Sequence, residues 1–147
     1  MTELRITDWA RDGAALSTVR FTVFVDEQGV PRELELDAAD ADAVHVIALD
    51  DDGRAIGTGR LLADGHIGRM AILKSHRGQG LGRAILKQLT VLAAQAGHES
   101  VFLHAQTSAE GFYRKAGFLP EGAAFEDAGI PHVTMRLQLG GAAGGRD

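Results

Sequence analysis

The chain of 147 residues has the length of one domain, and its 45% apolar and 24% charged residues are typical of a globular protein. A net charge of −5 argues against a nucleic-acid-binding protein, and the absence of cysteine excludes disulfides, thiolate metal sites and a cysteine nucleophile. No apolar run reaches the roughly 20 residues of a membrane span, and residues 1–13 lack the apolar core of a signal peptide, so we expect no membrane contact and a cytoplasmic location.

The first part of the chain predicts a strand, a helix and an acidic connection. Residues 3–9 alternate as in a strand. Apolar side chains then recur at helical spacing within residues 14–29: Leu16, Val19, Val23 and Phe24. Gly29 and the proline that follows it end this helix. Residues 32–43 are acidic and irregular, and they predict either a short helix or a loop.

The rest of the chain predicts five strands and two helices. Two strands within residues 45–62 join at Asp52-Gly53, a turn-forming pair, and residues 66–73 form the next strand. The later elements are a helix with one apolar face (81–96), a strand (100–106), a short helix (108–118) and a last strand (131–139). This order predicts one α/β domain over residues 1–139, in which an antiparallel meander leads into helix crossovers. A disordered Gly/Ala-rich tail is expected at 140–147.

Three glycines stand at alternate positions of residues 76–86 (HRGQGLGRAIL), directly before the first of these helices: Gly78, Gly80 and Gly82. The dinucleotide fingerprint G-x-G-x-x-G would need a glycine at one of two later positions, where the chain has Arg83 and Ile85. The P-loop motif G-x-x-x-x-G-K-S/T would need Gly-Lys five residues after a glycine, and five residues after Gly78 the chain has Arg83. Neither nucleotide motif is present.

The loop nevertheless has the composition of an anion site. Glycines let several backbone N–H groups point the same way, and the helix N-terminus adds partial positive charge. Arg77 and Arg83 add full charges. The combination suits a pyrophosphate. The competing interpretation is a tight turn that requires positive φ, which accounts for one glycine more easily than for three.

The segment Arg77-Gly78-Gln79-Gly80-Leu81-Gly82 matches the signature Q/R-x-x-G-x-G/A of the GNAT superfamily of acyl-CoA-dependent N-acyltransferases. Residues 111–118 (GFYRKAGF) resemble a second block of the family, F/L-Y-x-K-x-G-F, and the resemblance covers nearly the whole chain. Residues 23–40 and 129–132 further resemble the small bacterial ElaA and YjcF-like branch. The resemblance implies the GNAT fold, a central, mostly antiparallel mixed sheet flanked by helices.

The resemblance also implies acetyl-CoA as the co-substrate. Its pyrophosphate is expected on the loop N–H groups, and the expected loop residues are Arg77, Gly78, Gln79, Gly80, Leu81, Gly82 and Arg83. The pantetheine arm is expected to pair, like an added strand, with the backbone of Met70, Ala71 and Ile72. Gln106 occupies the position at which many relatives carry an asparagine that touches the cofactor.

In this family an amine attacks the thioester directly, so the site needs a base, an oxyanion donor and a partner for the departing thiolate. Tyr113, the only tyrosine, matches the family's tyrosine that faces the thioester sulfur, although a core aromatic is the alternative interpretation. A backbone N–H of Ala71 or Ile72 is the expected oxyanion donor.

Two residues are candidates for the general base. Glu27 follows the first helix, and a partly buried carboxylate with a raised pKa could accept the proton there. His132 would enter the last strand near the same pocket. Plain structural roles are equally open for both, and Glu126 is a weaker candidate. We expect His104 in the core, His45 and His66 at the surface or in turns, and no metal, because the histidines lack ligand spacing.

These observations predict an acetyl-CoA-dependent N-acetyltransferase that acts on a primary amine of a small molecule. The alternatives are a protein or peptide amine acetyltransferase, a non-catalytic acyl-CoA-binding sensor, and a bare pyrophosphate-binding nucleotide domain. The acidic residues of 33–42 form either a solvated face or an attractor for a cationic amine. The acceptor, the acyl-chain preference and the formation of a homodimer stay open.

Overall fold

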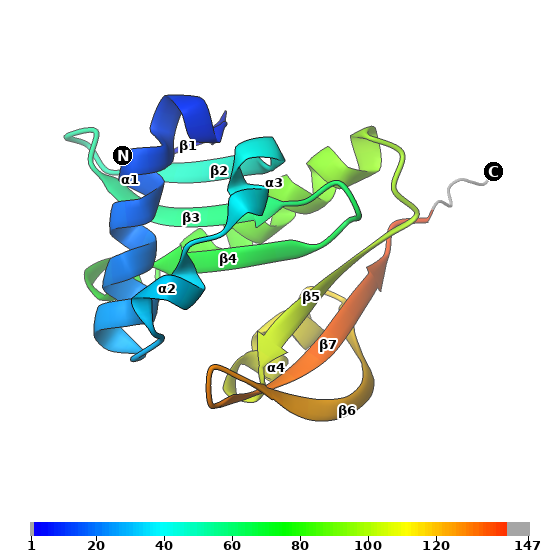
Figure 1. Ribbon diagram of the computed structural model, residues 1–147. Coiled ribbons are helices and arrows are strands. Elements are labelled where there is room, and N and C mark those ends of the chain that lie inside the picture. The colour runs from blue at the N-terminus through cyan, green and yellow to red at the C-terminus, as the bar shows by residue number, and fades with distance from the viewer. Residues whose placement is uncertain (1, 141–147) are drawn as a thin grey trace.

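Figure 1 shows the computed structural model of the protein, which describes residues 2–140. The strands are β1 (Glu3–Thr7), β2 (Val44–Leu49), β3 (Ala55–Leu61), β4 (Ile67–Ile72), β5 (Ser100–Gln106), β6 (Leu119–Asp127) and β7 (Ile130–Gln138). The α-helices are α1 (Trp9–Arg20), α2 (Arg32–Glu35), α3 (Leu81–Gln95) and α4 (Glu110–Lys115). A π-helix η1 (Phe21–Glu27) and the short 3-10 helices η2 (Ala38–Asp42), η3 (Lys74–His76) and η4 (Thr107–Ala109) complete the chain. Residues 141–147 of the predicted tail lie outside the described residues.

The strands form two antiparallel sheets, one in the order β1-β2-β3-β4 and one in the order β5-β7-β6. The first is the predicted meander, which is confirmed. The sheets meet where His66 forms a parallel bridge with Phe102, and the Phe102 N–H donates to the Gly65 carbonyl over 3.1 Å. Beyond this contact β4 and β5 diverge (Figure 1), so the mixed sheet is divided and open between them.

The first sheet is covered on both faces. Helix α3 packs on the face that carries Val46 and Ala48, and α1 packs on the other face, where Leu16 meets Ile47. Gly59 of β3 lets α3 approach closely, because a Cβ at this position would lie only 2.6 Å from Ile85 Cγ2. Residues 73–80, which include η3, lead from the end of β4 to the N-terminus of α3.

Two elements differ from the sequence prediction. Helix α1 begins at Trp9, earlier than predicted, because the Asp8 side chain caps it by accepting the Arg11 N–H over 2.8 Å. The sequence predicts no strand at residues 119–127, yet β6 pairs there with β7. Its side chains are almost all exposed and its register shifts between Glu121 and Phe125, so the alternation that signals a strand is absent. Within residues 2–140 no helix is both long and apolar enough to cross a membrane.

Candidate functional site

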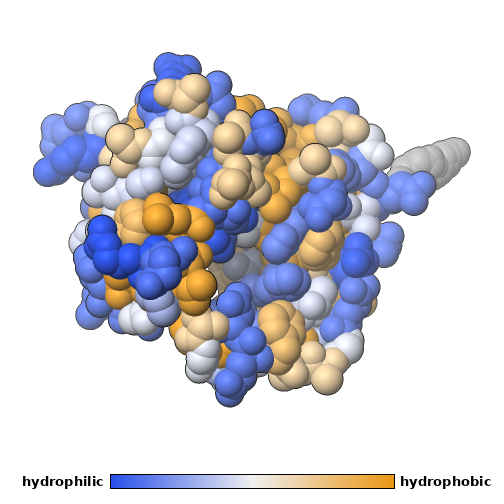
Figure 2. All heavy atoms as spheres, viewed as in Figure 1, coloured by the Kyte–Doolittle hydropathy of each residue, from blue (hydrophilic) through white to orange (hydrophobic). Residues whose placement is uncertain are grey.

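A cavity of about 640 Å³ lies where β4 and β5 diverge, and Figure 2 shows the hollow near the centre of the visible face. Residues of η1, α2 and η2 form one side of it, and β5, β7 and the β6–β7 turn form the other. Its titratable side chains are Glu35, Asp37, Arg60, His66, Arg69, His104, Tyr113, Asp127 and His132. The cavity therefore brings together groups that are far apart in the sequence.

Tyr113 lies on α4 and lines the cavity. Its ring meets Phe112 and Phe118 edge-on, at centroid distances of 5.0 and 6.0 Å, so it is also part of the core. Burial raises the pKa of the Tyr113 hydroxyl to about 12, and within residues 2–140 this hydroxyl has no hydrogen-bond partner. The phenol is therefore protonated and available as a donor at neutral pH.

His132 of β7 also lines the cavity, with only 9% of the residue exposed. Its Nδ1 lies 2.7 Å from the carbonyl oxygen of Ile130. A carbonyl can only accept, so Nδ1 carries the proton of the neutral ring and Nε2 keeps its lone pair. The Phe125 ring stacks on the imidazole at 6.0 Å and fixes its orientation. His132 thus has the tautomer that a proton acceptor requires.

His66 and His104 form an imidazole pair on the cavity wall, with ring centroids 4.7 Å apart. His66 also stacks on Phe102 at 4.8 Å, and burial together with the neighbouring His104 lowers the pKa of His66. The prediction of His104 as a core histidine is wrong, because its side chain is exposed in the cavity. The surface position predicted for His45 is also wrong, because His45 is 1% exposed and its Nε2 lies 3.0 Å from the Asp40 carbonyl oxygen.

The acidic stretch is only partly a solvated face, because Glu33 and Asp42 are exposed whereas Glu35 and Asp40 are buried and paired with arginines. Asp40 is 2% exposed and accepts two hydrogen bonds of 2.9 Å from the Arg20 guanidinium and another of 2.9 Å from Arg60. Glu35 is 4% exposed and accepts the Arg20 Nε–H over 2.6 Å. Burial alone would raise the pKa of Asp40, but the hydrogen bonds from Arg20 and Arg60 outweigh it and hold this pKa below its ordinary value.

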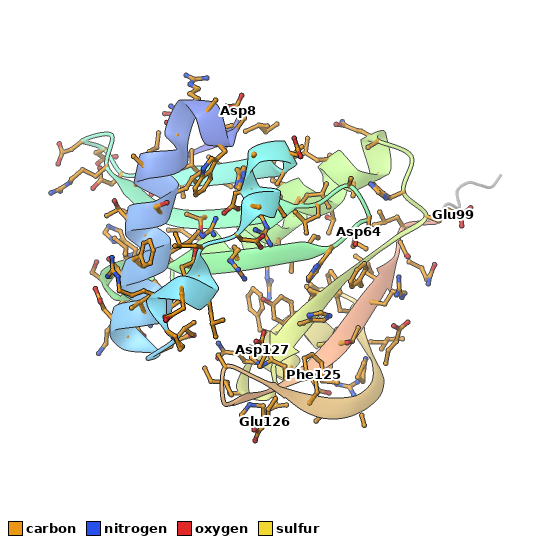
Figure 3. The ribbon with its side chains drawn as sticks, in the orientation of Figure 1. Asp8, Asp64, Glu99, Phe125, Glu126 and Asp127 are labelled. Carbon is orange, nitrogen blue, oxygen red and sulfur yellow. The ribbon has the colours of Figure 1, made fainter. Side chains whose placement is uncertain are left out.

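Glu27 was predicted as a partly buried carboxylate with a raised pKa, and both expectations are wrong. Glu27 lies at the end of η1, is exposed, and forms a two-pronged ion pair with Arg77 at 2.6 and 2.7 Å. The hydrogen bond from Arg77 lowers the pKa of Glu27 instead of raising it, and Glu27 is not among the cavity-lining residues. Glu126, the weaker candidate, also lies outside the cavity, on the outer side of the β6–β7 hairpin (Figure 3).

The glycine-rich loop between β4 and α3 has an open, exposed backbone. Gly78 and Gly80 have positive φ values of 79° and 83°, so their conformation alone requires glycine. Gly82 has ordinary helical geometry, and a Cβ there would only touch Phe112 at 3.5 Å. No side chain of residues 2–140 caps the N-terminus of α3 by a hydrogen bond, so its first N–H groups face outward without a protein partner. Tight turning thus explains two of the glycines, and the uncapped helix end retains the character of an anion site.

The edge of β4 that faces β5 is unpaired beyond His66 within the described residues. The Leu73 N–H donates to Ile56 of β3 over 2.9 Å, so by strand alternation the Ala71 N–H also faces β3. The N–H and C=O of Ile72 therefore face the open edge, where this carbonyl accepts the Arg77 Nε–H over 2.9 Å. Of the two expected oxyanion donors, only Ile72 has an outward N–H.

Two of the residues expected to bind the cofactor have hydrogen-bond partners within the protein. Arg77 is bound by Glu27 and by the Ile72 carbonyl, so its guanidinium holds the loop against η1. Gln106 lines the cavity, and its side-chain amide donates to Gln28 Oε1 over 2.9 Å. Gln79 and Arg83 are exposed beside the loop.

Residues 10–139 match the family described as Acetyltransferase (GNAT) domain. The chain belongs to the GNAT acetyltransferase family. The uncharacterized N-acetyltransferase YjcF of Bacillus subtilis (strain 168) is 43% identical over 122 residues, which cover 80% of this chain and 86% of YjcF. An acyl-CoA N-acyltransferase from Pseudomonas aeruginosa has a TM-score of 0.83 at 29% identity, with 93% and 99% of the two chains covered. Escherichia coli ElaA has a TM-score of 0.82 at 27% identity, with 92% and 99% covered.

The GNAT assignment confirms the family that the two sequence motifs indicated. The similarity to YjcF and ElaA confirms the branch that residues 23–40 and 129–132 indicated. The protein is a GNAT-type N-acetyltransferase, and acyl-CoA is the co-substrate that this fold uses. The described residues fit such a molecule at two places. The open edge of β4 can pair with an amide-rich arm, and the uncapped N-terminus of α3 can receive a pyrophosphate.

Proposed function

We propose that the protein transfers the acetyl group of acetyl-CoA directly to the primary amine of a small molecule bound in the cavity. The observation that carries this proposal is the convergence of Tyr113, His132 and Met70 on one cavity at the open edge of β4. A proton donor, a proton acceptor and the strand expected to hold the thioester arm thus border a single cavity.

His132 is the proposed base. The contact with Ile130 involves only Nδ1, so the lone pair on Nε2 is available. It can accept the proton of the attacking amine directly or through one water. The low exposure of the ring keeps bulk water from competing for this proton transfer.

Tyr113 and Ile72 are proposed to stabilise the two charges that develop on the thioester. The outward N–H of Ile72 is suited to the carbonyl oxygen as it becomes an oxyanion. The Tyr113 hydroxyl, protonated and without a protein partner in the described chain, is suited to the departing sulfur. Arg77, Gly78, Gln79, Gly80, Leu81, Gly82 and Arg83 are proposed to bind the pyrophosphate, Arg77 by holding the loop in place.

The test is the release of coenzyme A thiol from acetyl-CoA with a panel of small amines and peptides. We expect turnover with small primary amines, and a His132→Ala variant with lower kcat but unchanged acetyl-CoA affinity. His98→Ala is the matched control, because His98 lies at the end of α3 and does not line the cavity. Turnover with peptides alone would favour a protein acetyltransferase, and tight acetyl-CoA binding without any turnover would favour a sensor.

A further inference from the structure

Arg69 has an unusual backbone conformation next to the proposed thioester position. It is one of two described non-glycine residues with positive φ, at 51°, and it lies where the pairing of β3 with β4 is interrupted between Thr58 and Arg60. The buried Thr58 hydroxyl donates to the Arg69 carbonyl over 2.9 Å and holds this conformation. A left-handed backbone conformation is energetically costly for a residue with a long side chain such as arginine. Such conformations persist mainly at functional sites, and β-bulges next to active sites likewise change the direction of a side chain.

The Arg69 guanidinium uses few of its donors. Its contacts to Glu35 Oε1 and Asp37 Oδ2 are long, 3.4 and 3.5 Å, and its Nε has no hydrogen-bond partner within residues 2–140. Both carboxylates have shorter partners elsewhere. Glu35 accepts the Arg20 Nε–H over 2.6 Å, and Asp37 lies 3.0 Å from Arg60. Burial lowers the pKa of Arg69, as expected for a cation with poor compensation.

The Nε atom of Arg69 is buried beside Glu35, so the donors that Arg69 can offer to a ligand are its terminal N–H groups. Arg69 is a lining residue, its side chain is 28% exposed, and it directly precedes Met70 on the strand proposed to hold the pantetheine arm. We propose that Arg69 binds a carboxylate of the acceptor, so that the acceptor is a primary amine with a carboxylate close by, as in an α-amino acid. This inference rests on the proposed function, because it names the acceptor class of the same site.

The chemistry favours a carboxylate over a second amino group. A guanidinium presents paired N–H donors that match the two oxygens of a carboxylate, and such charge-assisted pairs are strong in a partly desolvated site. The three acids Glu35, Asp37 and Asp40 are balanced by three arginines, Arg20, Arg60 and Arg69, so these acids offer little attraction to a second cation. Asp127 is the lining carboxylate without such a partner among the described residues, and it lies across the cavity on the β6–β7 hairpin (Figure 3).

The test compares each common L-amino acid with the amine formed by its decarboxylation, for example phenylalanine with 2-phenylethylamine and lysine with 1,5-diaminopentane. The measured quantity is the ratio of kcat/KM within a pair, from thiol release at saturating acetyl-CoA. We expect the accepted amino acid to exceed its decarboxylated partner at least about tenfold, the usual scale of one charge-assisted pair. Arg69→Gln should bring this ratio near one, and Arg69→Lys should keep part of it.

Arg54→Gln is the matched control, because Arg54 is 74% exposed in the β2–β3 turn and should leave the ratio unchanged. Equal kcat/KM within the wild-type pairs, or preference for the diamine, would overturn this inference and leave the proposed function intact. The wild-type ratio decides the matter even if the Arg69 variants fail to fold. Acetyl-CoA binding without thiol release for any amine would instead overturn the proposed function, and this inference with it.

Discussion

Replacing Tyr113 by phenylalanine removes only a hydroxyl from a ring that Phe112 and Phe118 hold in place. The ring keeps its packing, and the deleted hydroxyl has no hydrogen bond to lose within residues 2–140. The free energy of unfolding should therefore change by less than about 0.5 kcal/mol. Any larger effect of Tyr113→Phe on the rate then reports on the reaction and not on the fold.

The size of the rate effect follows from the acidity of the phenol. Burial raises the pKa of Tyr113 to about 12, whereas thiols ordinarily titrate near about 8.5. Complete proton transfer to the thiolate would then cost about 5 kcal/mol, so Tyr113 acts mainly as a hydrogen-bond donor. One hydrogen bond to a charged group contributes about 1.5–3 kcal/mol, which corresponds to a fall in kcat of roughly 10- to 150-fold.

The assay is thiol release at saturating acceptor, with acetyl-CoA affinity measured separately by calorimetry. Tyr113→Phe should lower kcat and kcat/KM together and leave the acetyl-CoA Kd unchanged. Burial disfavours the phenolate, so the phenol stays protonated as the pH rises to about 12 and Tyr113 gives no alkaline loss of rate near pH 10. Phe112→Leu disturbs the packing around the ring but keeps the hydroxyl, and an equal rate loss in that variant would assign the effect to packing. Wild-type turnover in Tyr113→Phe, with chemistry rate-limiting, would refute the role.

Three further predictions concern the loop, the buried charges and η1. Gly82→Val should weaken acetyl-CoA binding at least about tenfold by calorimetry, whereas Ala94→Val, at an exposed position of the same helix, should not. Asp40→Asn should lower the free energy of urea unfolding by about 3–5 kcal/mol, whereas the exposed Asp42→Asn should change it little. Because the folded pKa of Asp40 is lowered, its contribution is present above the ordinary carboxyl pKa and is lost as pH falls through the folded value. Glu27→Gln should leave the pH dependence of kcat unchanged, and loss of its acidic limb would restore Glu27 as the base.

The elements that form the expected cofactor side could be predicted from sequence because they are local. A strand, a glycine loop and a helix start are adjacent in the chain, and their recognition groups are backbone N–H donors that any matching sequence supplies. The strand 100–106 was predicted with the bounds that the structure gives to β5. Even there the reason for the glycines was only partly right, since Gly78 and Gly80 are required by positive φ.

The acceptor side could not be predicted in the same way, because its chemistry depends on contacts between distant segments. Glu27 was expected to have a raised pKa, but Arg77, fifty residues later in the chain, reaches it and lowers that pKa. His104 was assigned to the core because it lies mid-strand, and only the divergence of β4 from β5 exposes it. The left-handed φ of Arg69 has no sequence signal, although a charged residue inside the apolar strand 66–73 marks the position.

The pairing of the buried charges determines which side chains remain available to bind an acceptor. The three acids Glu35, Asp37 and Asp40 are matched by the three arginines Arg20, Arg60 and Arg69, so this cluster carries no net charge into the cavity. A neutral cluster exerts little long-range attraction, and selection must then come from directional hydrogen bonds. Of the two arginines that line the cavity, Arg69 is the more exposed, with 28% of its side chain exposed against 4% for Arg60. The imidazole rings of the opposite wall offer acceptors and flat apolar area. An acceptor with an anionic end and an amine thus fits the groups that remain unsatisfied. Arg69 can bind the anionic end, and Asp127 is the lining carboxylate of residues 2–140 that is left for the amine, whereas Glu35 and Asp37 are already paired with arginines.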